Sequence, residues 1–310
     1  MPLQPTLVTM VWRGGARLER CLRSIAASKQ HFSRVLVSVT SAETSEDMQL
    51  ASAFAREQPG VDVICTGSEL PTMQHQAFWV DHLERTGAQP SDWVYWLSYD
   101  DEVRLTGIEA IVDAKGNWPL VHGTAYLGPW AMRHESAEHL FDGPWNQPLE
   151  SWTSFPIDGP TRLPVPEWIC EQVRQPTYVQ MSGSVCPLES FQALRDRRPR
   201  KRGPMRIEMA IASAPPSRYV EEFSEPVSVI YGRSNSDRAN YRQTARKEDV
   251  HLAAWLTRFA GLRPAEWRRL AAIGGTVAKT YAQTLIRHST LPQEQWRVRN
   301  IVPPDATHEY

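Results

Sequence analysis

Three acidic residues follow one another directly after a short apolar segment in the first third of the chain. Trp93 to Leu97 is aromatic and apolar, which predicts a buried strand, and Asp100, Asp101 and Glu102 come just after it. Carboxylates this close repel one another unless a cation or a proton lies between them. Mg²⁺ and Mn²⁺ take carboxylate oxygens and share their other positions with phosphates. The cluster is therefore either a divalent-metal site for a diphosphate or a solvated acidic turn.

The residues after the cluster indicate that the acids lie in a loop. Thr106 and Glu109 have the spacing of a capping box before an apolar pair, which predicts that a helix begins at Thr106. The acids are then not needed as helix caps and remain at the carboxyl end of the strand. In an open α/β sheet this edge is the one that binds ligands.

Alternating strand and helix patterns precede the acids. Apolar runs predict strands over residues 6–12, 34–40, 61–66 and 93–99. Helical periodicity predicts helices over 16–27, over a segment that Thr44 and Asp47 open, and over 71–84. Four such units predict an α/β fold with a mostly parallel twisted sheet flanked by helices.

The rest of the chain carries weaker signals. Residues 117–180 are rich in Pro and Trp, so we expect an irregular region whose tryptophans pack on the sheet or stack against a sugar. Further on, strand–turn–strand is expected over 178–187, helices over 188–194 and 207–213, and a strand over 227–231. The basic run 195–206 is interpreted as a solvated loop, with a diphosphate clamp or an anionic membrane contact as alternatives. Residues 242–310 predict a C-terminal helical extension.

The composition excludes several classes of protein. The chain has 310 residues and a formal charge of −1, so nothing in its overall charge suggests nucleic acid as a partner. Four scattered cysteines without a C-x-x-C pair fit a reducing cytoplasm. No stretch is apolar enough to span a bilayer, so any contact with the inner face of a membrane would be peripheral. Dinucleotide-binding and Walker glycine motifs are absent.

Taken in order, these features resemble glycosyltransferase family 2, the inverting nucleotide-sugar transferases with the GT-A fold. LVTMVWRGGARLERCLRSI looks like the family's first βα unit, and WLSYDDEV resembles its strand that ends in an acidic D-x-D-D-like motif. SGSVCPLESFQAL resembles the segment after its acceptor-side strand. The resemblance implies a Rossmann-like GT-A domain over residues 1–241, with 117–180 on the acceptor side and 242–310 added. Three departures are Ser98, where the family often has an Asp, 38–41, which lacks the Asp common after the second strand, and Glu208-Met209, where the family has a paired E-D near its catalytic acid.

The resemblance also implies a reaction and a set of site residues. A sugar would move from a nucleotide-diphosphate donor to a hydroxyl of a glycan or lipid-linked acceptor, in bacterial glycan or polysaccharide biosynthesis, with inversion. Asp100 and Asp101 would hold Mg²⁺ or Mn²⁺ against the donor diphosphate. Glu208 would be the catalytic base, with Glu171 in reserve. The donor-binding residues would be Val11, Trp12, Arg13, Ser41, Ser98 and Asp101.

Several alternatives stay open at this point. Glu208 could instead pair structurally with Arg206 or Arg218, and Trp12 could be a core residue. A sugar-phosphate nucleotidyltransferase would need a longer glycine-rich basic loop than Arg13-Gly14-Gly15. A glycosyltransferase-like protein that has lost catalysis and binds a sugar or a partner would explain Ser98, but the retained acids oppose it.

Overall fold

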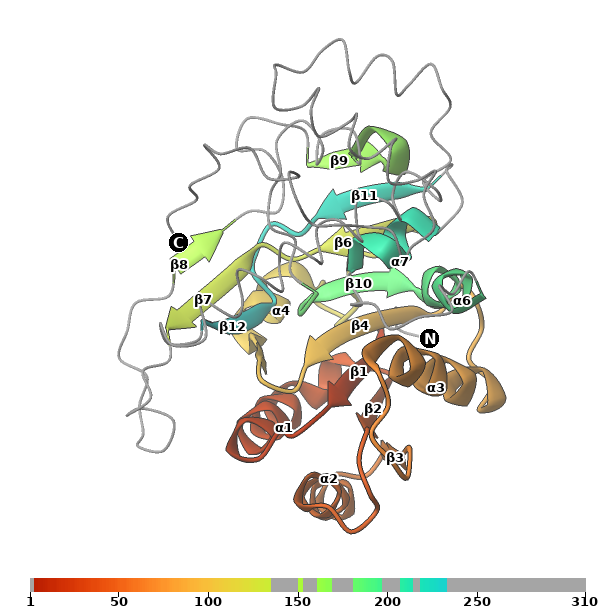
Figure 1. Ribbon diagram of the computed structural model, residues 1–310. Coiled ribbons are helices and arrows are strands. Elements are labelled where there is room, and N and C mark those ends of the chain that lie inside the picture. The colour runs from red at the N-terminus through yellow and green to blue at the C-terminus, as the bar shows by residue number, and fades with distance from the viewer. Residues whose placement is uncertain are drawn as a thin grey trace, which may run out of the picture.

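The protein is built on one large sheet with helices on both faces, as the computed structural model shows (Figure 1). The structure describes residues 3–134, 150–152, 161–168, 181–196, 207–213 and 218–232. The first part alternates strands and helices as the sequence predicts. Its elements are β1 (Thr6–Val11), α1 (Ala16–Ser28), the 3-10 helix η1 (Lys29–His31), β2 (Arg34–Val39), α2 (Glu46–Glu57), β3 (Val61–Cys65), α3 (Thr72–Arg85) and β4 (Trp93–Ser98).

The second part of the chain adds shorter elements and completes two sheets. These elements are β5 (Glu102–Val103), α4 (Leu105–Ile111), β6 (Thr124–Leu127), β7 (Trp130–His134), β8 (Glu150–Trp152), β9 (Arg162–Pro164), β10 (Ser184–Pro187), α6 (Leu188–Asp196), α7 (Ile207–Ser213), β11 (Tyr219–Glu222) and β12 (Ser228–Gly232). The eight-stranded sheet has the order β3-β2-β1-β4-β10-β6-β11-β9, and a smaller sheet has the order β5-β12-β7-β8.

The large sheet is mixed but mostly parallel. β1 pairs in parallel with both β2 and β4, and β2 pairs in parallel with β3. β10 lies antiparallel between β4 and β6, whereas β6 and β11 are again parallel. The predicted α/β class and the mostly parallel sheet flanked by helices are confirmed.

Two apolar layers fix the helices to opposite faces of this sheet. On one face, α1, α2 and α4 bury Leu18, Ile25, Phe54 and Ile108. On the other face, α3, α6 and α7 contribute a second cluster, which includes Met73, Trp79, Leu83, Phe191, Leu194, Ile207 and Ile211. Because each helix presents one apolar stripe, burying the stripes on both faces holds the strands in a three-layer arrangement.

Some local predictions were wrong. Thr106 does not cap a helix: α4 begins at Leu105, and no side chain caps it. At α2 the cap is Ser45, whose hydroxyl accepts a hydrogen bond from Met48 N, so Thr44 and Asp47 do not open this helix as expected. The described parts of residues 117–180 contain four short strands, β6 to β9, where we expected irregular chain.

Other predictions lie outside the described residues. These include Glu171, the strand expected over 178–180, most of the basic run and the helical extension over 242–310. Arg195, at the start of the basic run, is described and belongs to α6. Its guanidinium forms ion pairs with Glu84 and with Asp81 (2.7 Å), so it joins α6 to α3. None of the helices in the described ranges has the length and apolarity needed to cross a bilayer.

A buried histidine makes the stability of the fold depend on pH. His75 Nε2 lies 2.7 Å from the Ser38 hydroxyl, and both residues are buried between α3 and β2. Burial lowers the pKa of His75 from 6.5 to about 4. The unfolded chain therefore takes up a proton as the pH falls through 6.5, whereas the folded protein does so only near 4. The free energy of unfolding should fall over this window by up to about 3 kcal/mol.

Urea denaturation at pH 7 and pH 5 measures this effect. Wild type should lose about 2 kcal/mol more between the two pH values than His75→Gln, because the variant has no imidazole to protonate. An equal loss in the two proteins would show that His75 is not the group responsible.

Candidate active site

The register of three parallel strands brings the loops that follow them to one edge of the sheet. Val11 pairs with Val39, and Met10 pairs with Ser98. Thr40 N donates to Val11 O at 3.0 Å, which continues the ladder beyond β2. Trp12 lies two residues after Met10, and Asp100 lies two residues after Ser98, the partner of Met10. The loop after β1 and the acidic loop after β4 therefore start side by side. This is the carboxyl edge, where open α/β sheets bind ligands.

The two adjacent aspartates differ in their surroundings. Asp101 is only 6% exposed and accepts hydrogen bonds from the Ser182 hydroxyl and from Tyr231 N (3.2 Å). Asp100 is partly exposed, and the Ser98 hydroxyl donates to its carboxylate. Burial, and next the charge of Asp100, raise the pKa of Asp101 well above its ordinary value. Asp101 therefore faces the packed interior of the loop, and Asp100 is the aspartate at the surface.

Arg20 on α1 binds the acidic loop through its guanidinium. Its Nη2 donates to the main-chain oxygen of Asp100 at 2.7 Å, and its Nε lies 3.2 Å from Glu102 Oε1. The guanidinium carbon is 3.6 Å from the ring centroid of Tyr231, whose hydroxyl donates to Glu102 Oε1 at 2.5 Å. Glu102, the third acid, is thus bound to α1 and β12. Sequence reasoning missed Arg20 and Tyr231, because no local pattern links three segments so distant along the chain.

The loop after β1 presents an aromatic ring and a cation. The Trp12 side chain is 48% exposed, so Trp12 is not a core residue. The Arg13 guanidinium lies 5.1 Å from the Trp12 ring centroid and pairs with Glu69 at 3.0 Å. Among the non-glycine residues that the structure describes, only Arg13 has a positive φ, of 52°. Such a backbone is held against its own preference, which is common at ligand-binding sites.

The remaining predicted site residues are Val11 and Ser41, which lie in the described part of the chain, and Glu208 and Glu171, whose side chains lie outside it. Val11 is fully buried in the core, and the Ser41 hydroxyl lies 2.6 Å from that of Ser45, the cap of α2. Glu208 is the second residue of α7, and its side chain lies outside the described part, as does the whole of Glu171. Arg218, the structural partner considered for Glu208, forms an ion pair with Glu189 at 2.5 Å.

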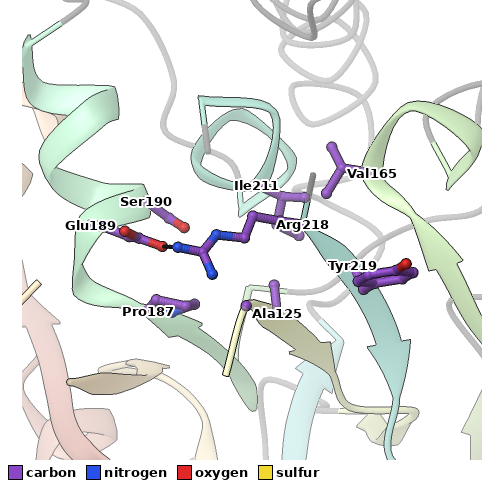
Figure 2. Close-up of a pocket in the computed structure, with 9 residues that line it drawn as sticks. Ala125, Val165, Pro187, Glu189, Ser190, Ile211, Arg218 and Tyr219 are labelled. Carbon is purple, nitrogen blue, oxygen red and sulfur yellow. Dashed lines mark ion pairs between the residues drawn. The ribbon is translucent and has the colours of Figure 1, made fainter. Parts of the chain in front are cut away.

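A small cavity lies at the opposite edge of the sheet. Arg218 extends through it toward Glu189 on α6, between β6, β10 and α7 (Figure 2). Its volume of about 10 Å³ gives room for a single water molecule. Pro187, which lines it, pairs with Trp93 at the start of β4, whereas Asp100 follows the end of β4. The cavity is therefore separate from the acidic edge and too small for a substrate.

The carboxylate of Asp100 is of the kind that binds a metal ion together with a phosphate ligand. Among the residues that the structure describes, no group of three or more His, Cys, Asp or Glu side chains is arranged to hold a metal. Mg²⁺ is commonly bound through one or two carboxylates together with substrate phosphates and water. Asp100, partly exposed at the sheet edge, suits that mode of binding, because one protein carboxylate is sufficient when a diphosphate supplies further oxygens.

Comparison with known proteins supports the fold. No family model and no curated protein matches the sequence. Among solved structures, residues 1–349 of S. aureus TarS match with a TM-score of 0.52 at 10% identity, covering 92% of this chain and 88% of that one. The same protein in complex with UDP-GlcNAc matches with a TM-score of 0.52 at 9% identity, with equal coverage. The chain therefore has the GT-A-like fold of TarS.

Proposed function

We propose that this protein is a glycosyltransferase that uses a nucleotide-sugar donor. One observation carries the proposal: a fold that in TarS holds UDP-GlcNAc here brings Trp12, Arg13 and Asp100 to the carboxyl edge of the sheet. An exposed tryptophan and a cation at one edge match the planar base and the anionic diphosphate of such a donor, and the carboxylate matches the metal ion that accompanies the diphosphate.

In this proposal Asp100 holds the cation that accompanies the donor. A bound Mg²⁺ or Mn²⁺ supplies positive charge that stabilises the nucleoside diphosphate as a leaving group. The Ser98 hydroxyl and Arg20 act on Asp100 itself, since the first donates to its carboxylate and the second to its main-chain oxygen. Both contacts restrict where the carboxylate can lie. Asp101 contributes by packing the loop against Ser182 and Tyr231.

Trp12 and Arg13 provide the donor with an aromatic face and a positive charge. The exposed indole suits stacking against a nucleotide base, because a large ring loses water-exposed apolar surface when it stacks. The Arg13 guanidinium already lies near the indole and is exposed, so it can exchange its ion pair with Glu69 for a phosphate oxygen.

The chemistry proposed is a single displacement with inversion. Glu208 on α7 is the proposed base that takes the proton from the acceptor hydroxyl, and Glu171 is the reserve candidate. The acceptor proposed is a glycan or lipid-linked sugar in bacterial polysaccharide synthesis. The protein acts in the cytoplasm, with any membrane contact peripheral.

A binding protein without catalysis is the second candidate. The observation that favours it is that Ser98 stands where the resemblance calls for an acid, and that its hydroxyl is already engaged with Asp100. Such a protein would bind the nucleotide sugar and leave it intact.

A ligand panel separates these possibilities. Nucleoside diphosphates and nucleotide sugars with each common base are tested by thermal shift, with and without Mn²⁺. A ligand at a hundred times its dissociation constant stabilises the folded state by about 2.7 kcal/mol. We expect one base to raise the midpoint, more so with Mn²⁺, and its nucleotide sugar to release nucleoside diphosphate on incubation. A shift without turnover would favour the binding protein, and no shift with any base would overturn both.

A further inference from the structure

A buried carboxylate from α2 occupies the loop that carries Trp12 and Arg13. Asp47 accepts hydrogen bonds from Gly14 N at 3.1 Å and 2.9 Å, through its two oxygens, and from Gly15 N at 2.9 Å. The residue is 6% exposed. Gly15 is the N-cap of α1, and no side chain of its own segment caps that helix. Asp47 therefore satisfies donors at the start of α1 from a different helix.

These backbone donors form the kind of concavity that binds anions. Consecutive N–H groups directed at one point, at the positive end of a helix, attract phosphate or carboxylate oxygens. Here the anion comes from the protein itself, because Asp47 binds both N–H groups. Because Asp47 already accepts hydrogen bonds from these N–H groups, they are not available to a donor diphosphate. The negative charge of the diphosphate would therefore be bound by Arg13 and by a cation at Asp100.

The Asp47 carboxylate fixes the loop after β1, which is closely packed and contains two residues with positive φ. Arg13 and Gly15 both have positive φ, of 52° and 50°. A Cβ on Gly14 would lie 2.7 Å from Leu18 Cβ and 3.2 Å from Tyr99 Cδ2, so the loop backbone contacts both α1 and the residue before Asp100. Asp47 thus holds the Trp12–Arg13 loop at a set position against the acidic loop.

We infer that Asp47 is a positioning residue for the donor: acting through Gly14 and Gly15, it presets Trp12 and Arg13 for the nucleotide. This inference rests on the proposed function, since it assigns Asp47 to that same site. Asp47 itself does not touch the donor, because it is buried behind the loop that does.

Binding of the nucleoside diphosphate that stabilises the wild type tests this role. In calorimetry with Mn²⁺, Asp47→Asn should bind it about tenfold more weakly, equal to about 1.4 kcal/mol. Glu46→Gln is the matched control, because it removes one negative charge from the neighbouring position of α2, which is exposed and does not contact the loop, and it should bind as the wild type does. In Asp47→Ala, added formate should restore tight binding in a saturable way, since it can replace the missing carboxylate.

Amide hydrogen exchange provides a readout that does not depend on the nucleotide. Peptides containing Gly14 and Gly15 should exchange faster in Asp47→Asn than in wild type or Glu46→Gln, with the strands unchanged. If wild type binds no nucleotide, the proposed function fails and the inference fails with it. If wild type binds but Asp47→Asn binds as tightly, or formate has no effect on Asp47→Ala, only the positioning role is overturned. A general loss of protection throughout Asp47→Asn would also contradict it.

Discussion

Asp100→Asn is expected to remove the dependence of nucleotide binding on Mn²⁺ and to lower kcat for sugar transfer by about a thousandfold. The asparagine has the shape of the aspartate and can still accept the Ser98 hydroxyl bond, so the loop should keep its fold. What it lacks is the negative charge that a hard cation requires. Losing the charge stabilisation of a leaving group costs factors of about 10²–10³ when a single catalytic donor is removed, and loss of a cation is at least as severe.

Initial rates at saturating donor and Mn²⁺, together with calorimetry with and without the metal, measure the effect. Glu109→Gln is a suitable control, since it neutralises an exposed acid on α4, close in sequence to the same loop, and should leave both quantities unchanged. Retention of metal-dependent binding by Asp100→Asn, with Glu109→Gln normal, would place the cation elsewhere and remove Asp100 from the site.

Gly107→Ala is expected to have the largest effect on stability. Gly107 is buried in α4, and a Cβ there would lie 1.8 Å from the carbonyl oxygen of Pro226 and 2.8 Å from its carbonyl carbon. Because the obstacle is backbone, no side-chain rotation can relieve it. The start of α4 is also tied to this segment, since Arg104 N donates to Val227 O at 2.9 Å. The free energy of unfolding should fall by about 3 kcal/mol, although alanine favours a helix by about 1 kcal/mol.

Urea denaturation followed by circular dichroism measures this loss. Glu109→Ala provides the comparison, because it changes an exposed position of the same helix and should alter stability by less than about 0.5 kcal/mol. A Gly107→Ala protein as stable as the wild type would mean that α4 does not approach residues 226 and 227 this closely.

The first half of the fold could be predicted because its information is local. Each strand from β1 to β4 is an apolar run bounded by turn residues, and each helix between them has a clear apolar face. The short strands β6, β7 and β9 could not be predicted in this way. They have three to five residues each, Pro129 directly precedes β7 and Pro164 ends β9, and they exist through pairing with β11 and β12 much later in the chain.

In the candidate site, too, the features that depend on local sequence could be predicted, and those that depend on long-range contacts could not. Strand ends in a parallel sheet share an edge, so the order of elements was enough to place Asp100 at the ligand-binding edge, whereas Trp12 and Arg13 entered through the resemblance. The inward position of Asp101 depends on Ser182 and Tyr231, which no spacing in the sequence connects to it. The sequence pattern assigned Asp47 to the start of a helix. In the structure Ser45 caps that helix, and the Asp47 carboxylate instead accepts hydrogen bonds from the loop after β1.

The antiparallel insertion of β10 has a consequence for how the chain is made. Residues 6–98 contain all of β3-β2-β1-β4, so this half of the sheet can assemble while the rest is still being synthesised. The free edge of β4 must then wait for β10, whose Ser184 pairs with Trp96. At ribosomal speeds the delay is on the order of ten seconds. During that time an uncharged aromatic strand, WVYWLS, lies unpaired at the border of a folded unit, which makes the nascent chain a substrate for chaperones and a hazard for aggregation.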